Sequence, residues 1–169
     1  MNTPVKNYSL NLANTDTYLF SVIFVAGNIL LPQLTHLIPQ GGLIWLPIYF
    51  FTLVAAYRYG IHVGLLTAVL SPLANHLLFG MPPAAALPII MTKSVLLAVA
   101  ASIAAKRFGM TSFWGILLTV LAYQLIGTSI EWAVGKDFTM AVQDFRIGIP
   151  GIILQWIGGY FVLRALVKI

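Results

Sequence analysis

One lysine of this sequence lies within an apolar stretch that is long enough to cross a membrane. Lys93 falls between Leu87 and Leu96, where most of the other residues are apolar. A charge inside a bilayer costs at least about 2.5 kcal/mol on insertion scales, so the side chain is expected to face a partner or a wet cavity. Two interpretations are open. Lys93 is the counter-charge for an anionic or polar ligand group, or it is structural, paired with Glu131 or extended toward the membrane surface.

Further polar residues fall at a similar depth in the two apolar stretches that follow. Glu131, Thr128 and Gln124 are three and four residues apart, so a helix places them on one face. Tyr123 lies one residue from that face, and Gln155 lies in the last stretch at the depth of the lysine. A single polar residue of this kind usually joins helices, whereas several that converge are typical of an apolar ligand pocket with a small polar set. The sequence therefore predicts a binding pocket.

Four residues near the ends of the apolar stretches are further candidates for this pocket. His36 lies at the end of the first stretch, and Asn75 and His76 come near the end of the third. They either contribute to the ligand site or lie in the headgroup region of the membrane. Trp132 is a candidate to stack on a ring of the ligand. No metal site is predicted, because there is no HExxH motif and the carboxylates are few and far apart in the sequence.

The motifs of several enzyme classes are missing from the sequence. There is no Walker A pattern and no G-x-G-x-x-G, so this chain is not expected to bind ATP or a dinucleotide by those means. There is no G-x-S-x-G elbow and no cysteine, which excludes that type of serine hydrolase, a cysteine nucleophile and thiolate metal ligands. We therefore expect a binding protein that is not an enzyme and holds no cofactor in this chain.

The composition indicates which elements must position these residues. Of 169 residues, 60% are hydrophobic and 8% are charged, and the mean hydropathy is +0.94. A soluble domain carries about 25% charged residues, and a spanning helix needs about 20 apolar residues. Long continuous apolar runs favour helices over a membrane barrel. We predict one all-α polytopic membrane domain over 1–169 with six spans, at about 18–37, 43–57, 62–79, 85–105, 112–134 and 147–167.

The basic residues predict how the chain is oriented in the membrane. The net charge is +5. In a membrane protein an excess of basic residues reflects the orientation of the chain in the bilayer, so it does not indicate a nucleic-acid partner, and none is expected. The positive-inside rule favours both termini in the cytoplasm. The inner ends of the spans then carry Lys6, Arg58, Lys106, Arg107, Arg164 and Lys168, and the outer ends carry only Lys136 and Arg146. The outer connections are then 38–42, 80–84 and 135–146.

Several different segments rich in proline, glycine and leucine follow one another along the chain in a particular order and spacing. They are Leu31–Gly42 (LPQLTHLIPQGG), Leu46–Pro47, Tyr59–Leu66, Ser71–Leu73, Gly80–Pro83 (GMPP) and Asp144–Gln155. Together they resemble the S components of energy-coupling factor (ECF) vitamin transporters, which are the substrate-binding membrane subunits of these importers. The resemblance covers residues 20–160, nearly the whole chain.

The resemblance implies a bundle of six helices in the cytoplasmic membrane of a bacterium or archaeon, which binds a vitamin or related micronutrient from outside. A transmembrane coupling protein and two ATPase subunits would be its partners, and ATP would be bound there. The S component would topple in the membrane to release its cargo. Lys93 suggests a carboxylate or phosphate on the cargo, or a zwitterion. The loops after the first and third spans would gate the pocket, and here they contain Pro39, Gly41, Gly80, Met81, Pro82 and Pro83.

One pattern of the family is missing, and one alternative function is open. Many S components carry Ala-x-x-x-Ala in the first helix for docking on the coupling protein, and Ser21–Asn28 has no such pair. Gly64 and Ala68 offer a face of small residues instead. The alternative is a non-transport membrane scaffold with an S-component-like fold. Tight binding of a ligand would separate the transport subunit from the scaffold.

Overall fold

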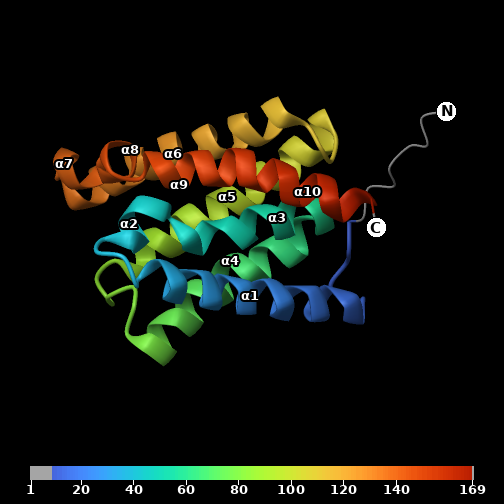
Figure 1. Ribbon diagram of the computed structural model, residues 1–169, viewed down its shortest axis with the longest axis horizontal. Coiled ribbons are helices and arrows are strands. Elements are labelled where there is room, and N and C mark those ends of the chain that lie inside the picture. The colour runs from blue at the N-terminus through green and yellow to red at the C-terminus, as the bar shows by residue number, and fades with distance from the viewer. Residues whose placement is uncertain (1–8, 169) are drawn as a thin grey trace.

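The computed structural model describes residues 9–168, and all regular structure in this part of the chain is helical. The long helices run side by side as a bundle (Figure 1). Five helical segments are long and apolar enough to cross a membrane. They are α1 (Thr15–Thr35), α4 (Ile61–Phe79), α5 (Leu87–Phe108), α6 (Phe113–Gly135) and the run Ile149–Lys168. The all-helical fold predicted from the composition is therefore confirmed, and the length and apolar composition of these five helices suggest a multi-pass membrane protein.

The predicted second span, 43–57, is not a continuous helix. It is divided into α2 (Gly41–Trp45), the 3₁₀ turn η1 (Pro47–Tyr49) and α3 (Phe50–Tyr59). The break falls at Leu46, whose φ of 46° lies in the left-handed region, and Pro47 then lacks the N–H that would continue a helix. Of the six predicted spans, five are thus present as helices long enough to cross a membrane, and the second, 43–57, is a broken segment in addition to these five.

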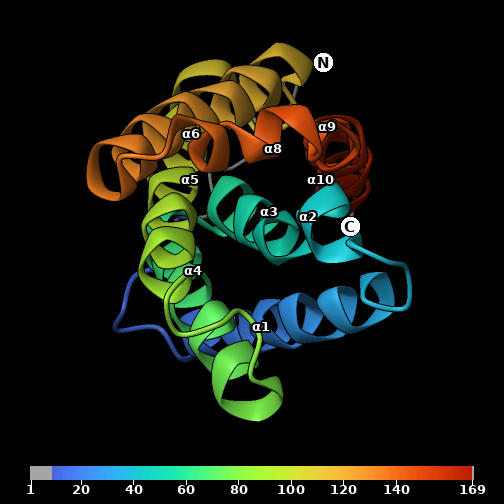
Figure 2. The same cartoon turned by 90° about the vertical axis from the view of Figure 1, so that its left-hand side faces the viewer.

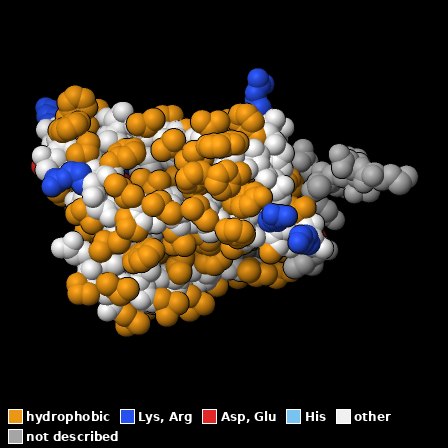
Figure 3. All heavy atoms as spheres, turned by 45° about the horizontal axis from the view of Figure 1, so that its top comes forward, with side chains coloured by type: hydrophobic (Ala, Val, Ile, Leu, Met, Phe, Trp, Pro, Cys, Tyr) orange, Lys and Arg blue, Asp and Glu red, His pale blue; other side chains and the backbone are white. Residues whose placement is uncertain are grey.

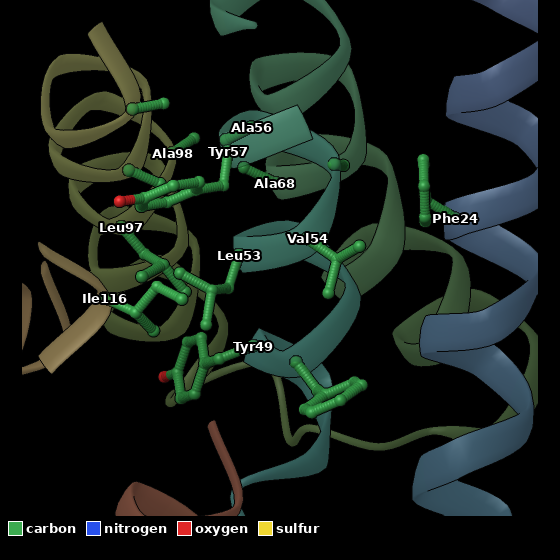
Figure 4. Packing of buried hydrophobic residues seen from close by; sticks show 14 of the residues in the cluster. Phe24, Tyr49, Leu53, Val54, Ala56, Tyr57, Ala68, Leu97, Ala98 and Ile116 are labelled. Atoms are coloured by element: carbon green, nitrogen blue, oxygen red, sulfur yellow. The ribbon is translucent and has the colours of Figure 1, made fainter. Parts of the chain in front are cut away.

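The short helix α3 lies at the centre of the bundle. Figure 2, which looks along the helices, shows α3 surrounded by the longer helices, and α1, α4, α5 and α10 pack directly against it. Seven of its ten residues are buried. Figure 4 shows Leu53 and Val54 of α3 among side chains from the neighbouring helices. Irregular backbone at membrane depth is tolerated where protein covers it, and this position explains why the broken segment is stable there.

The small residues of α4 are used for packing inside the chain. A Cβ on Gly64 would collide with Ala56 of α3 and would lie 3.3 Å from the Cβ of Ala98 in α5. Ala68, one turn further along α4, is fully buried. The face that the sequence suggested for docking a partner is therefore covered by α3 and α5, because close helix contact needs small residues at the same positions.

The last spanning segment contains a change of helical pitch. It consists of α9 (Ile149–Ile153), η2 (Leu154–Gly158) and α10 (Gly159–Lys168), with no break between them. The middle piece, η2, is a single π-helical turn. Such turns occur frequently at functional sites, and this one contains the predicted site residue Gln155.

The two ends of the bundle differ in their connections and their charge. One end, here called the loop end, carries the connections 36–40, 80–86 and 136–148 (Figure 1). The opposite end, here called the basic end, joins α3 to α4 and α5 to α6. Figure 3 shows hydrophobic side chains across the middle of one face, with Lys and Arg side chains toward the ends. Among the described residues, the basic end has Arg58, Lys106, Arg107, Arg164 and Lys168, and the loop end has Lys136 and Arg146. Lys6, which the topology prediction also used, lies outside the described residues.

Candidate functional site

Lys93 is buried where α5, α6 and α8 (Gln143–Arg146) meet. Its side chain is only 5% exposed, and its Nζ lies 2.6 Å from Glu131 Oε2 and 2.9 Å from Asp144 Oδ2. Because α5 begins at Leu87, Lys93 lies about 9 Å along the helix at about 1.5 Å per residue. The ion pair with Glu131, which was one of the two interpretations of this lysine, is present. Asp144 is a second partner that the sequence reasoning missed.

A glycine on α6 makes room for the lysine side chain. A Cβ on Gly127 would lie 2.6 Å from Lys93 Cγ, so the aliphatic part of the lysine crosses α6 at a residue that has no side chain. Gly127 and Glu131 are four residues apart and therefore share one face of the helix. The same spacing was visible in the sequence, but a glycine between polar residues does not by itself indicate a trough for a lysine.

Asp144 reaches the lysine because the segment after α6 folds back onto the bundle. This segment was expected to be an outer loop over 135–146. It instead forms two short helices, α7 (Phe138–Ala141) and α8, and packs against α6 and α2. A signal for Asp144 was present, since the chain has only four acidic residues and a buried lysine needs carboxylate partners.

The three charged side chains, here called the Lys93 cluster, are Lys93, Glu131 and Asp144. With all three ionised, the cluster has one positive and two negative charges. The lysine ammonium is therefore already compensated by two carboxylates at short distance. An anionic ligand would have to displace one of them, and it would leave that carboxylate buried without its partner, which is costly.

A second polar group, here called the Tyr123 group, joins α6 to the π-helical turn η2. The hydroxyl of Tyr123 donates to Gln155 Oε1 at 2.8 Å, and Gln124 Nε2 donates to the same hydroxyl at 3.1 Å. All three residues are buried. Gln124 Oε1 and Gln155 Nε2 have no hydrogen-bond partner among the described residues. The structure thus brings these three predicted residues together, with one acceptor and one donor left over.

A pocket of about 550 Å³ opens at the loop end, between the two connections predicted to act as gates. Its wall is mostly apolar and includes Pro32 of α1 and Ile90 of α5. Three polar side chains line it: His36, Gln40 and Asn75. Of the predicted gating residues, Gly80 does not line the pocket, and the others do: Pro39, Gly41, Met81, Pro82 and Pro83.

The two connections around the pocket are held in place by local contacts. His76 Nδ1 donates to the carbonyl oxygen of Pro82 at 2.8 Å, which fastens the second connection to the end of α4. Gly80 ends α4 with a φ of 67°, a conformation that glycine adopts without strain. A Cβ on Gly41 would collide with the carbonyl group of Thr35, so the first connection closes tightly only with glycine there. His76 and these glycines therefore hold the two connections in place around the pocket. They contribute no polar side chain to its wall.

Asn75 belongs both to the pocket and to a buried hydrogen-bond network. Its Nδ2 donates to the carbonyl oxygens of Asn28 and Ser71, each at 2.9 Å. Asn28 in turn donates to Thr52 and Ser71 and accepts from the backbone N–H of Phe51. The network ties α1, α3 and α4 together beside the pocket and fixes the orientation of the Asn75 amide.

The structure divides the predicted binding residues between separate places. His36 and Asn75 line the pocket, whereas the Lys93 cluster and the Tyr123 group do not. Ile90, which lines the pocket, lies one helical turn before Lys93 on α5. Thr128 Oγ1 has no hydrogen-bond partner among residues 9–168. Trp132 is half exposed, and its ring packs edge-on against Phe138 at 5.4 Å between centroids.

Comparisons of the chain with protein-family models, with curated proteins and with solved structures found no match. The function is therefore inferred from the residues and the geometry described above.

Proposed function

We propose that this chain is the substrate-binding membrane subunit of an ECF-type importer for a vitamin or related micronutrient. The observation that carries the proposal is the pocket of about 550 Å³ between two loops at one end of the bundle. Small-molecule sites have volumes of about 300–1,000 Å³, apolar walls and a few polar groups. The pocket at the loop end has all three properties, and its two connections are the ones that the family resemblance assigns to the gate.

The proposed topology has six passes with both termini in the cytoplasm. The residues 41–59, which contain α2, η1 and α3, run from the loop end to the basic end and supply the sixth pass. The basic end carries more Lys and Arg residues than the loop end among the described residues, and the positive-inside rule places such an end in the cytoplasm. The pocket then opens to the outside of a bacterial or archaeal cytoplasmic membrane.

The proposed transport step requires partner proteins. Cargo enters the pocket from outside, and the connections 36–40 and 80–86 close over it. A transmembrane coupling protein and two ATPase subunits then drive toppling of the subunit in the bilayer and release of the cargo inside. This assignment of the ATPases to partners is consistent with the lack of a Walker A pattern in the sequence.

The test is mass spectrometry of small molecules released from the gently purified full chain. We expect a stoichiometric compound from the parent protein and from Ala133→Trp, a control at an exposed residue of α6 that lies outside the pocket and its two connections. Ala86→Trp places a large side chain in the pocket wall and is expected to lose the compound. A parent protein that releases only lipid would overturn the proposal.

One observation favours the scaffold alternative. Lys93 already has two carboxylate partners in the structure, as expected if these residues serve only to hold helices together. A scaffold needs no ligand, so the release of only lipid from the parent protein would support it. A search for protein partners of the purified chain would then be the next measurement.

A further inference from the structure

We propose that the pocket at the loop end takes an uncharged small molecule with an apolar body and at least one N–H or O–H group, which donates a hydrogen bond to Asn75 Oδ1. This inference rests on the proposed function, and it adds the chemical class of the cargo. It also departs from the expectation, based on Lys93, that the cargo carries a carboxylate or phosphate.

The pocket wall offers no fixed charge to a ligand. None of the side chains that line it is Asp, Glu, Lys or Arg. A charged ligand group would lose its hydration in this wall without gaining a counter-charge, and an unpaired charge in an apolar site is expensive. The apolar side chains, among them Ile48 and Ile90, instead favour an apolar ring or chain.

The nearest buried cation does not change this conclusion. Lys93 does not line the pocket, and its Nζ lies within 3 Å of two carboxylate oxygens. Because the Lys93 cluster has an excess of negative charge when all three groups are ionised, its field repels an anion. A carboxylate or phosphate on the cargo is therefore disfavoured both by the wall and by the cluster.

Asn75 supplies a hydrogen-bond acceptor with a fixed direction. Both hydrogens of its Nδ2 are used in bonds to the carbonyl oxygens of Asn28 and Ser71, which determines which end of the amide is the oxygen. The residue is 2% exposed and lines the pocket. Its Oδ1 accepts no hydrogen bond from the residues that the structure describes. This oxygen is not among the fully buried side-chain atoms that lack a partner, so it is accessible from the pocket. A ligand N–H or O–H can therefore take the place of water on this acceptor, at a net gain of about one hydrogen bond.

The experiment compares four probes that share a fused bicyclic ring on the full chain in lipid nanodiscs, by equilibrium dialysis against protein-free nanodiscs. Indole is uncharged and has an N–H, benzofuran is uncharged and has none, indole-3-acetate is an anion and tryptamine is a cation. We expect indole to bind about fivefold more tightly than benzofuran, the effect of one hydrogen bond. Both charged probes are expected to bind at least tenfold more weakly than indole.

Two variants test whether the acceptor is Asn75. His36→Phe and Gln40→Gly each remove one of the other two polar side chains of the wall, and glycine suits the left-handed backbone of residue 40. The preference for indole over benzofuran is expected to persist in both. Its disappearance in either variant would assign the acceptor to that residue and overturn the role of Asn75.

The outcomes separate this inference from the proposed function. Binding of indole-3-acetate or tryptamine as tight as that of indole, or no saturable binding of any probe, would overturn the uncharged class. Either result leaves the proposed function standing as long as the parent protein releases a compound that Ala86→Trp has lost. Release of only lipid from the parent protein would overturn the proposed function itself, independently of how the four probes bind.

Discussion

Replacing Lys93 by methionine is expected to destabilise the protein strongly. The substitution keeps an unbranched apolar side chain in the trough beside Gly127 but removes the charge between Glu131 and Asp144. Their side chains are 26% and 13% exposed, so both carboxylates are left largely buried without a cation. Breaking a buried ion pair costs about 3–5 kcal/mol, and the partial exposure of Glu131 favours the lower end of this range.

Two combined variants separate the loss of charge balance from the loss of the side chain. Lys93→Met with Glu131→Gln leaves one orphaned carboxylate, Asp144, and is expected to be intermediate in stability. Addition of Asp144→Asn removes every charge of the cluster. Uncharged replacements of buried ion pairs are often neutral, so the triple variant is expected to approach the stability of the parent.

Thermal unfolding in detergent, followed by tryptophan fluorescence, measures the effect. For a chain of this size, about 3 kcal/mol corresponds to a decrease in Tm of about 6–12 °C for the single variant. Lys106→Met, at an exposed lysine of the basic end, is the control and is expected to keep its Tm. An unchanged Tm for Lys93→Met, or a triple variant no more stable than the single one, would refute the account of the cluster. Loss of the bound compound from a stable triple variant would instead make Lys93 a counter-charge for the ligand.

Three further predictions concern the core and the topology. Tyr123→Phe removes the hydroxyl between two glutamines, leaves Gln155 Oε1 without its donor and is expected to cost about 1–3 kcal/mol in thermal unfolding. Gly64→Val has no room for its side chain in the contact of α4 with α3, and we expect little folded protein in size-exclusion chromatography. Because the chain has no cysteine, single cysteines can be introduced and labelled with a membrane-impermeant maleimide. A cysteine at Thr139 is expected to react in intact cells, and a cysteine at Lys106 only after lysis.

Each of these predictions has a matched control or a contrary result. Tyr160→Phe removes a hydroxyl from an exposed contact and is expected to leave the Tm unchanged, whereas an equal loss in both tyrosine variants would speak against the buried network. Gly135→Ala adds a Cβ in open space and is expected to fold normally. Labelling of the Lys106 cysteine in intact cells would reverse the proposed orientation of the chain.

Much of the candidate site was predictable from residue type and spacing. The shared helix face of Glu131, Thr128 and Gln124 follows from helical periodicity, and the predicted partner of Lys93 follows from the cost of a lone charge in lipid. The two connections around the pocket were visible as clusters of proline and glycine, which commonly end helices. These are local or single-residue properties, and sequence alone carries them.

The broken segment around Leu46 shows where local patterns are insufficient. Hydropathy describes how apolar 43–57 is, but not whether lipid or protein covers it. Lipid would require an unbroken helix. The tertiary structure surrounds α3 with other helices, so the break at Leu46 and Pro47 is tolerated.

The sequence by itself determined a helical membrane protein, because the apolar composition and the length of the apolar runs decide this. It also placed polar residues in the half of the bundle nearest the loop end, because helical periodicity and the cost of an isolated charge depend only on residue type and spacing. Only the tertiary structure decided which groups meet. Lys93 and Asp144 are 51 residues apart in the chain, and their contact exists because α7 and α8 fold back over α6. The separation of the Lys93 cluster from the pocket beside Asn75 is likewise a consequence of how the helices pack, since long-range contacts depend on the whole arrangement and not on local spacing.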